Sequence, residues 1–134
     1  MGATRPTSLV LLGLVTFGPL VVSGCENHVS STRQCLGGGG TTETYTNYTF
    51  DIETGPAVEV AGNCHVVLEH CTIRAPQGIR VSEGGRVTVV GGSLVAREAA
   101  VIASDNARVS FDGTEVVGTI QRTGAATVSG VPTP

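Results

Sequence analysis

Hydrophobic and polar residues alternate in three segments of the chain that align with one another. The segments are residues 63–68 (NCHVVL), 84–89 (GGRVTV) and 106–111 (NARVSF), and their starts lie 21 and 22 residues apart (63→84→106). Successive side chains of a β-strand point to opposite faces. Each segment is therefore predicted to be a short strand with one apolar face, within a repeat that covers Asn63–Val117.

The alternation also predicts which side chains point inward. In the first strand of each repeat these are Val66 and Leu68, Val87 and Val89, and Val109 and Phe111. A corner is expected at 70–71, 91–92 and 113–114, followed by one inward position at Ile73, Leu94 and Val116. A second strand is expected at 58–60, 79–81 and 101–103. Asn63, Gly84 and Asn106 recur at the turn before the first strand, and Asn and Gly accept left-handed backbone angles most readily.

A constant period near 21 with two short strands predicts an all-β fold, a small right-handed parallel β-helix (solenoid) of three to four coils. Equivalent strands would pair one coil apart, at about 4.8 Å. Hairpins of a β-sandwich would vary more in length, and the Leu/Asn consensus of a leucine-rich repeat is absent. The domain is expected at 45–130, with a tail at 131–134. Residues 45–52 would form an irregular first rung capped by Tyr48 and Phe50, and 119–121 with 127–129 a short last rung.

Composition agrees with this fold and disfavours one class of partner. Hydrophobic residues make up 40% of the chain but aromatic residues only 4%, so the core would consist of aliphatic side chains that suit narrow β-rich layers. The formal charge is −3 and no basic run is present, so nucleic acid is not expected as a partner.

The first 25 residues resemble a bacterial lipoprotein signal peptide. Arg5 precedes an apolar run that Gly and Pro interrupt, and the run ends in Val22-Ser23-Gly24-Cys25. This ending is similar to a lipobox, whose Cys is acylated before cleavage. The resemblance implies a cleaved signal at 1–24, lipid attachment at Cys25 and, because Glu26 follows, the outer membrane of a bacterial cell. An ordinary secretory signal with an incidental Cys is the alternative. Residues 25–44 have the composition of a flexible tether.

Exported chains meet oxidising conditions, in which disulfides form. With Cys25 lipidated, Cys35, Cys64 and Cys71 allow at most one intramolecular bridge. Cys64 and Cys71 lie seven residues apart, mostly along a predicted strand, which is too far for a bridge. Cys35 is therefore expected to pair with one of them, and the other would be a small buried hydrophobic residue.

Taken together, the lipobox, the tether and the coils resemble short bacterial right-handed β-helix lipoproteins and secreted proteins of uncharacterised function. The resemblance covers about Ala57–Gly130 and the signal peptide. It implies the fold and the lipid anchor, and it assigns no reaction.

Outward columns are where such a solenoid would bind a ligand. His65, Arg86 and Arg108 are expected at one outward position of consecutive coils, where stacked cations could attract an anionic glycan or a phosphate group. The alternative favoured by the sequence is that Glu83 and Asp105, three residues before each Arg, neutralise this column. The next outward column, Val67, Thr88 and Ser110, is interpreted as ordinary strand surface.

No catalytic residue, metal ligand or cofactor is expected. Enzymatic β-helices such as pectate lyases carry long loops over clustered carboxylates, whereas the loops here are short. Glu69 and Asp112 share one relative position two coils apart, at about 10 Å, which suits an inverting carboxylate pair, but no cleft is predicted around them. The adjacent pairs Cys64-His65 and His70-Cys71 are not expected to form a metal site, because strand alternation directs Cys64 inward and His65 outward and no CxxC spacing is present.

Three hypotheses for the function follow. The first is a non-catalytic, lipid-anchored envelope protein that displays a β-helix as a structural or interaction module. The second is a binding module for polysaccharide, in particular anionic glycan. The third is a degenerate carbohydrate-active enzyme. The expected partners are the membrane, through Cys25, and a polysaccharide or another envelope protein.

Overall fold

The structure is a computed structural model that describes residues 27–37 and 40–132. These residues form strands and no helix, so none of them belongs to a helix that could span a membrane. The strands are β1 (His28–Val29), β2 (Arg33–Cys35), β3 (Thr42–Thr46), β4 (Thr49–Asp51), β5 (Pro56–Val60), β6 (His65–Glu69), β7 (Thr72–Val81), β8 (Arg86–Val90), β9 (Ser93–Ala103), β10 (Arg108–Asp112), β11 (Glu115–Arg122) and β12 (Thr127–Ser129).

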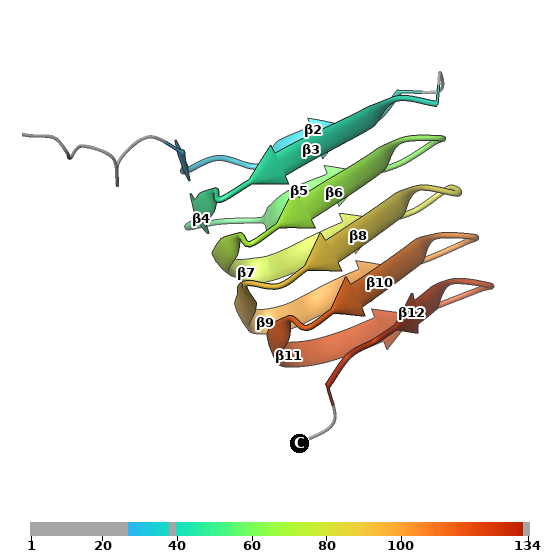
Figure 1. The fold of residues 1–134 in the computed structure, drawn as a ribbon. Coiled ribbons are helices and arrows are strands. Elements are labelled where there is room, and N and C mark those ends of the chain that lie inside the picture. The colour runs from blue at the N-terminus through green and yellow to red at the C-terminus, as the bar shows by residue number, and fades with distance from the viewer. Residues whose placement is uncertain (1–26, 38–39, 133–134) are drawn as a thin grey trace, which may run out of the picture.

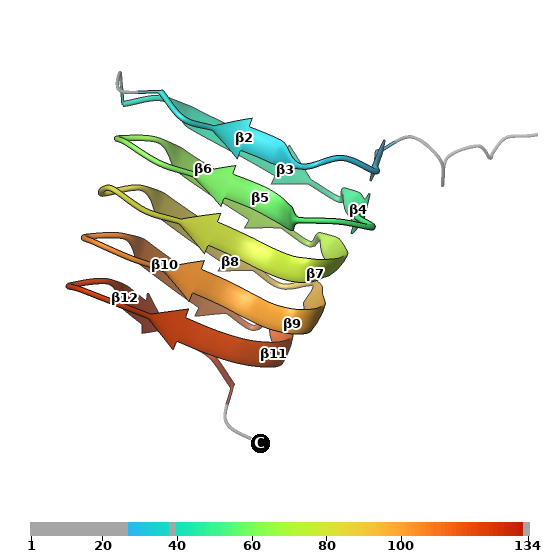
Figure 2. The same cartoon turned by 180° about the vertical axis from the view of Figure 1, so that it is seen from behind.

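Every strand pairs in parallel with the equivalent strand one turn away. One sheet stacks β3, β6, β8, β10 and β12 (Figure 1). The other stacks β4, β7, β9 and β11, with β1 beside β4 and β2 beside β5 (Figure 2). In Figure 1 the strands in front run to the left, those behind run to the right, and the chain descends, which is a right-handed coil. The fold is an all-β parallel β-solenoid, as predicted.

The two sheets define two outward surfaces. The front face is the outward side of β3, β6, β8, β10 and β12. The back face is the outward side of β2 and β5 and of the second halves of β7, β9 and β11. The long strands β7, β9 and β11 bend: the first limb of β7 pairs with β4 and its second limb with β5.

The solenoid is longer than the sequence indicated. The front sheet has five strands, one for each turn (42→65→86→108→127), instead of three to four coils. The extra turn lies in the segment 25–44 that was expected to be a tether, because β1, β2 and part of β3 belong to it. The sequence did not predict this turn because these strands are mostly polar. A terminal rung has solvent on one side and does not need an apolar pattern. Residues 45–52 likewise form regular strands, not an irregular rung.

The core consists of columns of inward side chains, and the predicted register is confirmed. Val66, Val87 and Val109 stand in register and are 1–2% exposed. The other inward columns are Leu68/Val89/Phe111, Phe50/Ile73/Leu94/Val116, Val58/Ile79/Val101/Ile120 and Val60/Val81/Ala103. All are buried except Val116 and Ile120 on the last turn, which are partly exposed.

Two lines of left-handed residues close each turn. At the corner after the front strand, Asn47, His70, Gly91 and Gly113 have φ of 61°, 55°, 64° and 70°. The last three lie where the corner was predicted. At the opposite turn the left-handed position is Gly62, Glu83, Asp105 and Gly124.

The left-handed position in the second line lies one residue earlier in the chain than predicted. Asn63 and Asn106 do not have positive φ, whereas Gly84 does. The amide of Ala107 donates to the carbonyl of Ser104, so Asp105 is the first central residue of a tight turn. That position requires positive φ in the primed turns that join strands closely.

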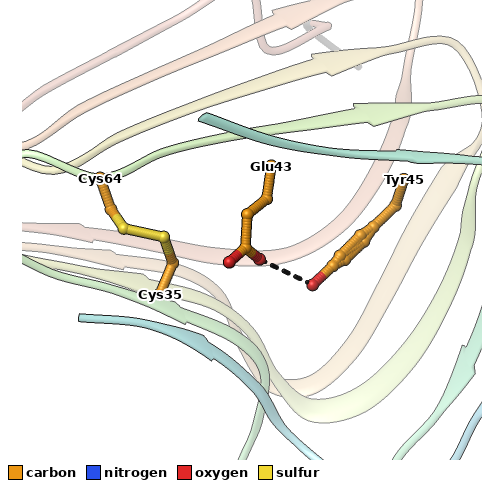
Figure 3. The surroundings of a disulfide bond; sticks show 4 residues. All are labelled: Cys35, Glu43, Tyr45 and Cys64. Carbon is orange, nitrogen blue, oxygen red and sulfur yellow. Dashed lines mark hydrogen bonds between the residues drawn. A yellow bond between two sulfur atoms is a disulfide. The ribbon is translucent and has the colours of Figure 1, made fainter. Parts of the chain in front are cut away.

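Cys35 and Cys64 form a disulfide that ties the first turn to the second, with a Cα–Cα distance of 5.9 Å (Figure 3). The expectation that Cys35 pairs with one of the two later cysteines is confirmed. Cys71 is the free cysteine of the described residues and is buried, 2% exposed. Burial and the neighbouring Glu69 raise the pKa of the Cys71 thiol, although hydrogen bonds with nearby backbone oppose this.

Candidate functional site

His65, Arg86 and Arg108 form one column on the front face. They begin β6, β8 and β10 and are direct partners in the parallel ladder. Adjacent strands lie about 4.8 Å apart, so the three side chains leave the sheet side by side. Strand alternation sends them outward because Val66, Val87 and Val109, one residue later, point into the core. We call these three residues the cationic column, and its predicted geometry is confirmed by the register.

The column borders a shallow depression of about 240 Å³ on the front face. Its second side is a row of hydroxyl groups two residues further along the strands, made by Thr88, Ser110 and Ser129, which are partners in the ladder. Thr127, on the last turn, continues the cationic column and also lines the depression. Guanidinium donors and hydroxyl groups therefore face the same hollow from two parallel rows.

The two arginines have no acidic partner. Neither Glu83 nor Asp105 forms an ion pair with Arg86 or Arg108, and the one ion pair within residues 27–37 and 40–132 lies elsewhere. The neutralisation by Glu83 and Asp105 that the sequence favoured does not take the form of an ion pair. Both acids take left-handed backbone angles in the turn, at φ of 54° and 60°. The sequence spacing of three residues crosses that turn, so it does not put each acid beside its arginine.

His65 differs from the arginines in its charge state. Burial, and secondarily the charge of Arg86, lower the pKa of His65 below its ordinary value of 6.5. Its Nε2 lies 2.9 Å from the Thr88 hydroxyl, a hydrogen bond that joins the two rows of the depression. At neutral pH the ring is thus mainly uncharged, and the two arginines supply the positive field.

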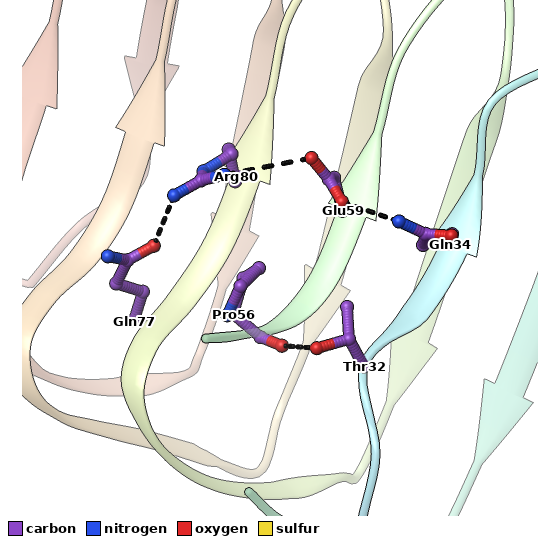
Figure 4. Close-up of polar contacts among 6 residues, drawn as sticks. All are labelled: Thr32, Gln34, Pro56, Glu59, Gln77 and Arg80. Atoms are coloured by element: carbon purple, nitrogen blue, oxygen red, sulfur yellow. Dashed lines mark hydrogen bonds and ion pairs between the residues drawn. The ribbon is translucent and has the colours of Figure 1, made fainter. Parts of the chain in front are cut away.

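The back face has a different arrangement (Figure 4). There Glu59 and Arg80 are partners in the ladder, and Arg80 Nη1 lies 3.7 Å from Glu59 Oε2. Gln34 donates to Glu59 at 2.8 Å, and Arg80 donates to Gln77 at 2.9 Å. The same ladder geometry therefore produces a self-neutralised row of polar contacts on this face.

The other predicted candidates do not assemble into a site. Glu69 and Asp112 are two turns apart in register, with Val90 between them, as predicted. Glu69 accepts a hydrogen bond from Thr46 and Asp112 is exposed on the open face of the sheet. No group of three or more metal-ligating side chains lies together in the part of the chain that the structure describes. Cys25, the predicted lipid attachment site, lies outside the described residues.

The hydroxyl row is the part of the depression that sequence reasoning missed. Thr88 and Ser110 were interpreted as ordinary strand surface, yet both line the hollow, as do Thr127 and Ser129 of the last turn. The signal was present, because the alternation puts Thr88 and Ser110 on the same side as the arginines two residues before them. The alternation does not show that a hollow lies between the two rows.

Comparisons with known proteins do not name a family for this chain. No protein-family model, no curated protein and no solved structure matches it.

Proposed function

We propose that the protein is a non-catalytic binding module of the cell envelope, and that its ligand is an anionic polysaccharide held in the depression on the front face. The observation that carries this proposal is the pair Arg86 and Arg108, which stand in ladder register, lack an acidic partner and line the hollow. Like charges on adjacent strands destabilise a sheet. Bound anions would relieve that repulsion.

A carboxylate- or sulfate-bearing polymer suits this arrangement. Guanidinium groups bind such anions with two parallel hydrogen bonds, which are stronger than neutral ones. The hydroxyl groups of Thr88 and Ser110 offer additional donors and acceptors to sugar hydroxyls. Because the solenoid repeats these groups from one rung to the next, a ligand that repeats its own charges can contact several rungs at once.

The proposal that the module is non-catalytic rests on where the carboxylates of Glu69 and Asp112 lie. An acid–base pair for glycoside cleavage needs one carboxyl group with a raised pKa beside a second one across the substrate. Asp112 is exposed to solvent, and Glu69 accepts a hydrogen bond from Thr46 and is separated from Asp112 by the rung of Val90. Neither residue lines the depression. Binding without turnover is the simpler use of this surface.

The test is binding of alginate, a uronate polymer, and of dextran sulfate, with uncharged dextran as the reference polymer. The double variant Arg86→Ala with Arg108→Ala is expected to weaken binding to the charged polymers by at least about 100-fold, since each charged hydrogen-bond partner contributes about 1.5–3 kcal/mol. Arg80→Ala removes one arginine from the back face and is the matched control, expected to bind as the wild type does. If the wild type binds neither charged polymer, or binds uncharged dextran equally well, the proposal is wrong and the front face is plain surface.

The location in the envelope rests on the lipobox resemblance at Cys25. Acyl chains on this residue would anchor the protein to a membrane. Expressed in a bacterium, the wild-type chain is expected in the membrane fraction, and Cys25→Ala is expected in the soluble fraction. Cys71→Ala, which removes a different cysteine, should leave the fractionation unchanged. Membrane association of Cys25→Ala would contradict the anchor.

A further inference from the structure

The depression on the front face is closed at one end. His65 Nε2 lies 2.9 Å from the Thr88 hydroxyl, and this hydrogen bond crosses from the cationic column to the hydroxyl row and from β6 to β8. Both side chains are half-buried, whereas Arg86 and Arg108 are exposed. The lining of the depression begins with this bonded pair and includes no residue of β3. The His65–Thr88 bridge therefore closes the end of the depression that lies toward the first turn.

Beyond the bridge, both rows of ligand-binding groups are interrupted. The ladder partner of Thr88 on β6 is the apolar residue Val67, which interrupts the hydroxyl row. The ladder partner of His65 on β3 is Thr42, so no further arginine extends the cationic column. Because burial and the charge of Arg86 lower its pKa, His65 adds little positive charge of its own at neutral pH. The groups that could bind an anion therefore end at Arg86.

The opposite end of the depression is open. Thr127 and Ser129 line it there, and both are exposed. β12 is the last strand of its sheet in the part of the chain that the structure describes. Gly130 then takes a left-handed φ of 78°, where an added Cβ would collide with the carbonyl of Phe111, and Val131 packs against the core. The chain after Ser129 thus turns under the solenoid and away from the front face, which leaves this end free for a ligand.

We propose that the depression binds the end of an anionic polysaccharide chain, with His65 as the residue that stops the chain. This inference rests on the function proposed above and adds which part of the polymer is bound. The terminal sugar lies against the His65 ring with its anion on Arg86, and a second anion lies on Arg108, about 4.8 Å further along the solenoid axis. The rest of the chain leaves through the open end, past Thr127.

A segment within a chain fits this depression less well, because it has to continue past both ends. At the closed end it would have to rise over the His65 ring, which takes its nearest anion away from Arg86. It would then pass over Val67, which offers no hydrogen bond. Each charged hydrogen bond that is lost weakens binding by about 10-fold or more. The geometry therefore favours a chain end over an internal segment.

The test measures how much of the full chain binds to alginate at saturation, using alginate preparations of equal mass and different mean chain length. Halving the chain length at constant mass doubles the number of chain ends and leaves the number of internal segments nearly unchanged. The amount of bound protein is therefore expected to double. This measurement needs no variant, so it does not depend on whether a substituted chain folds. Bound protein that follows the mass of alginate and not the number of chain ends would overturn the proposal.

A substitution tests the role of His65 directly. His65→Ala removes the bridge and is expected to let internal segments bind, so that the amount bound to long alginate chains rises severalfold and no longer depends on chain length. His28→Ala removes an exposed histidine of β1, outside the depression, and is the matched control, expected to keep the wild-type dependence on chain ends. A folded His65→Ala that keeps this dependence would overturn the assignment of His65.

Failure of this inference can be told apart from failure of the proposed function. If the wild type binds alginate and the variant Arg86→Ala with Arg108→Ala does not, but saturation follows mass, the binding function stands and the chain-end assignment is wrong. If the wild type does not bind alginate at any chain length, both are wrong.

Discussion

The front and back faces of the solenoid use one geometry with opposite electrostatic results. On both faces, each outward side chain stands beside its equivalent on the next strand. On the back face the neighbours are Glu59 and Arg80, which form an ion pair. On the front face the neighbours are Arg86 and Arg108, which have like charge and no acidic contact.

This difference separates a structural surface from a candidate binding surface. Opposite charges in register stabilise a sheet by a few tenths of a kcal/mol and leave little field for a ligand, whereas like charges in register cost a similar amount. The front face therefore retains a small destabilisation at the position where a depression has formed. The following predictions test whether charge register is what distinguishes the two faces.

The largest effect is expected on stability, from a substitution in the apolar core that lies between the two faces. Val87 is 1% exposed, between outward Arg86 and Thr88. Val87→Asp puts an unpaired carboxylate into the core and is expected to reduce the free energy of unfolding by about 4 kcal/mol or more. Thr88→Asp introduces an aspartate one position later, on the outward side, and this variant is expected to fold. Denaturant unfolding followed by circular dichroism measures both, and a cooperative, wild-type-like transition for Val87→Asp would contradict the register.

A gain of binding on the back face is the second prediction. In the background of Arg86→Ala with Arg108→Ala, the further change Glu59→Arg puts two guanidinium groups in register on the back face, at positions 59 and 80. Binding of dextran sulfate is expected to recover by about 10-fold, since one charged contact contributes about 1.5 kcal/mol or more. Glu59→Gln removes the acid without adding a base and is expected to recover less. Absence of recovery would show that register alone is insufficient and that the hydroxyl row is required.

The smallest effect concerns pH on the front face. The pKa of His65 is lowered below 6.5, so protonation at lower pH adds a third charge to the cationic column. Affinity for dextran sulfate, which stays charged, is expected to rise as pH falls from 7 through the lowered pKa, and His65→Gln should remove this dependence. For stability the sign is reversed: the unfolded chain binds the proton more readily between the two pKa values, so the free energy of unfolding falls as pH decreases through that window. An affinity independent of pH in the wild type would contradict the assignment.

The sequence predicted the repetitive part of this protein well because the repeat is local. Alternation in 84–89 places Val87 inward and Arg86 outward without any knowledge of distant residues, and the equal spacing of three such segments aligns the columns. The terminal turn was missed for the converse reason. Arg33 and Glu43 occupy inward columns, and only their pairing with β5 and β6 reveals it.

The cysteines and acids show the same limit. Spacing along the chain limited the possible disulfides to Cys35 with Cys64 or Cys35 with Cys71. The choice of Cys64 depends on the turn that brings β2 beside β5. Spacing also suggested that Glu83 would neutralise Arg86, yet Glu83 lies in a tight turn at φ of 54° and makes no ion pair.

By itself, then, the sequence determined the solenoid, its register and the identity of the cationic column, because the two-residue alternation is a property of neighbouring residues and the spacing near 21 can be counted along the chain. Only the tertiary structure decided the number of turns, the choice of Cys64, the lack of an ion pair on Arg86 and Arg108 and the hollow between the arginine and hydroxyl rows. Each of these depends on distances between residues about one turn or more apart in the chain, which stacking sets and spacing along the chain does not.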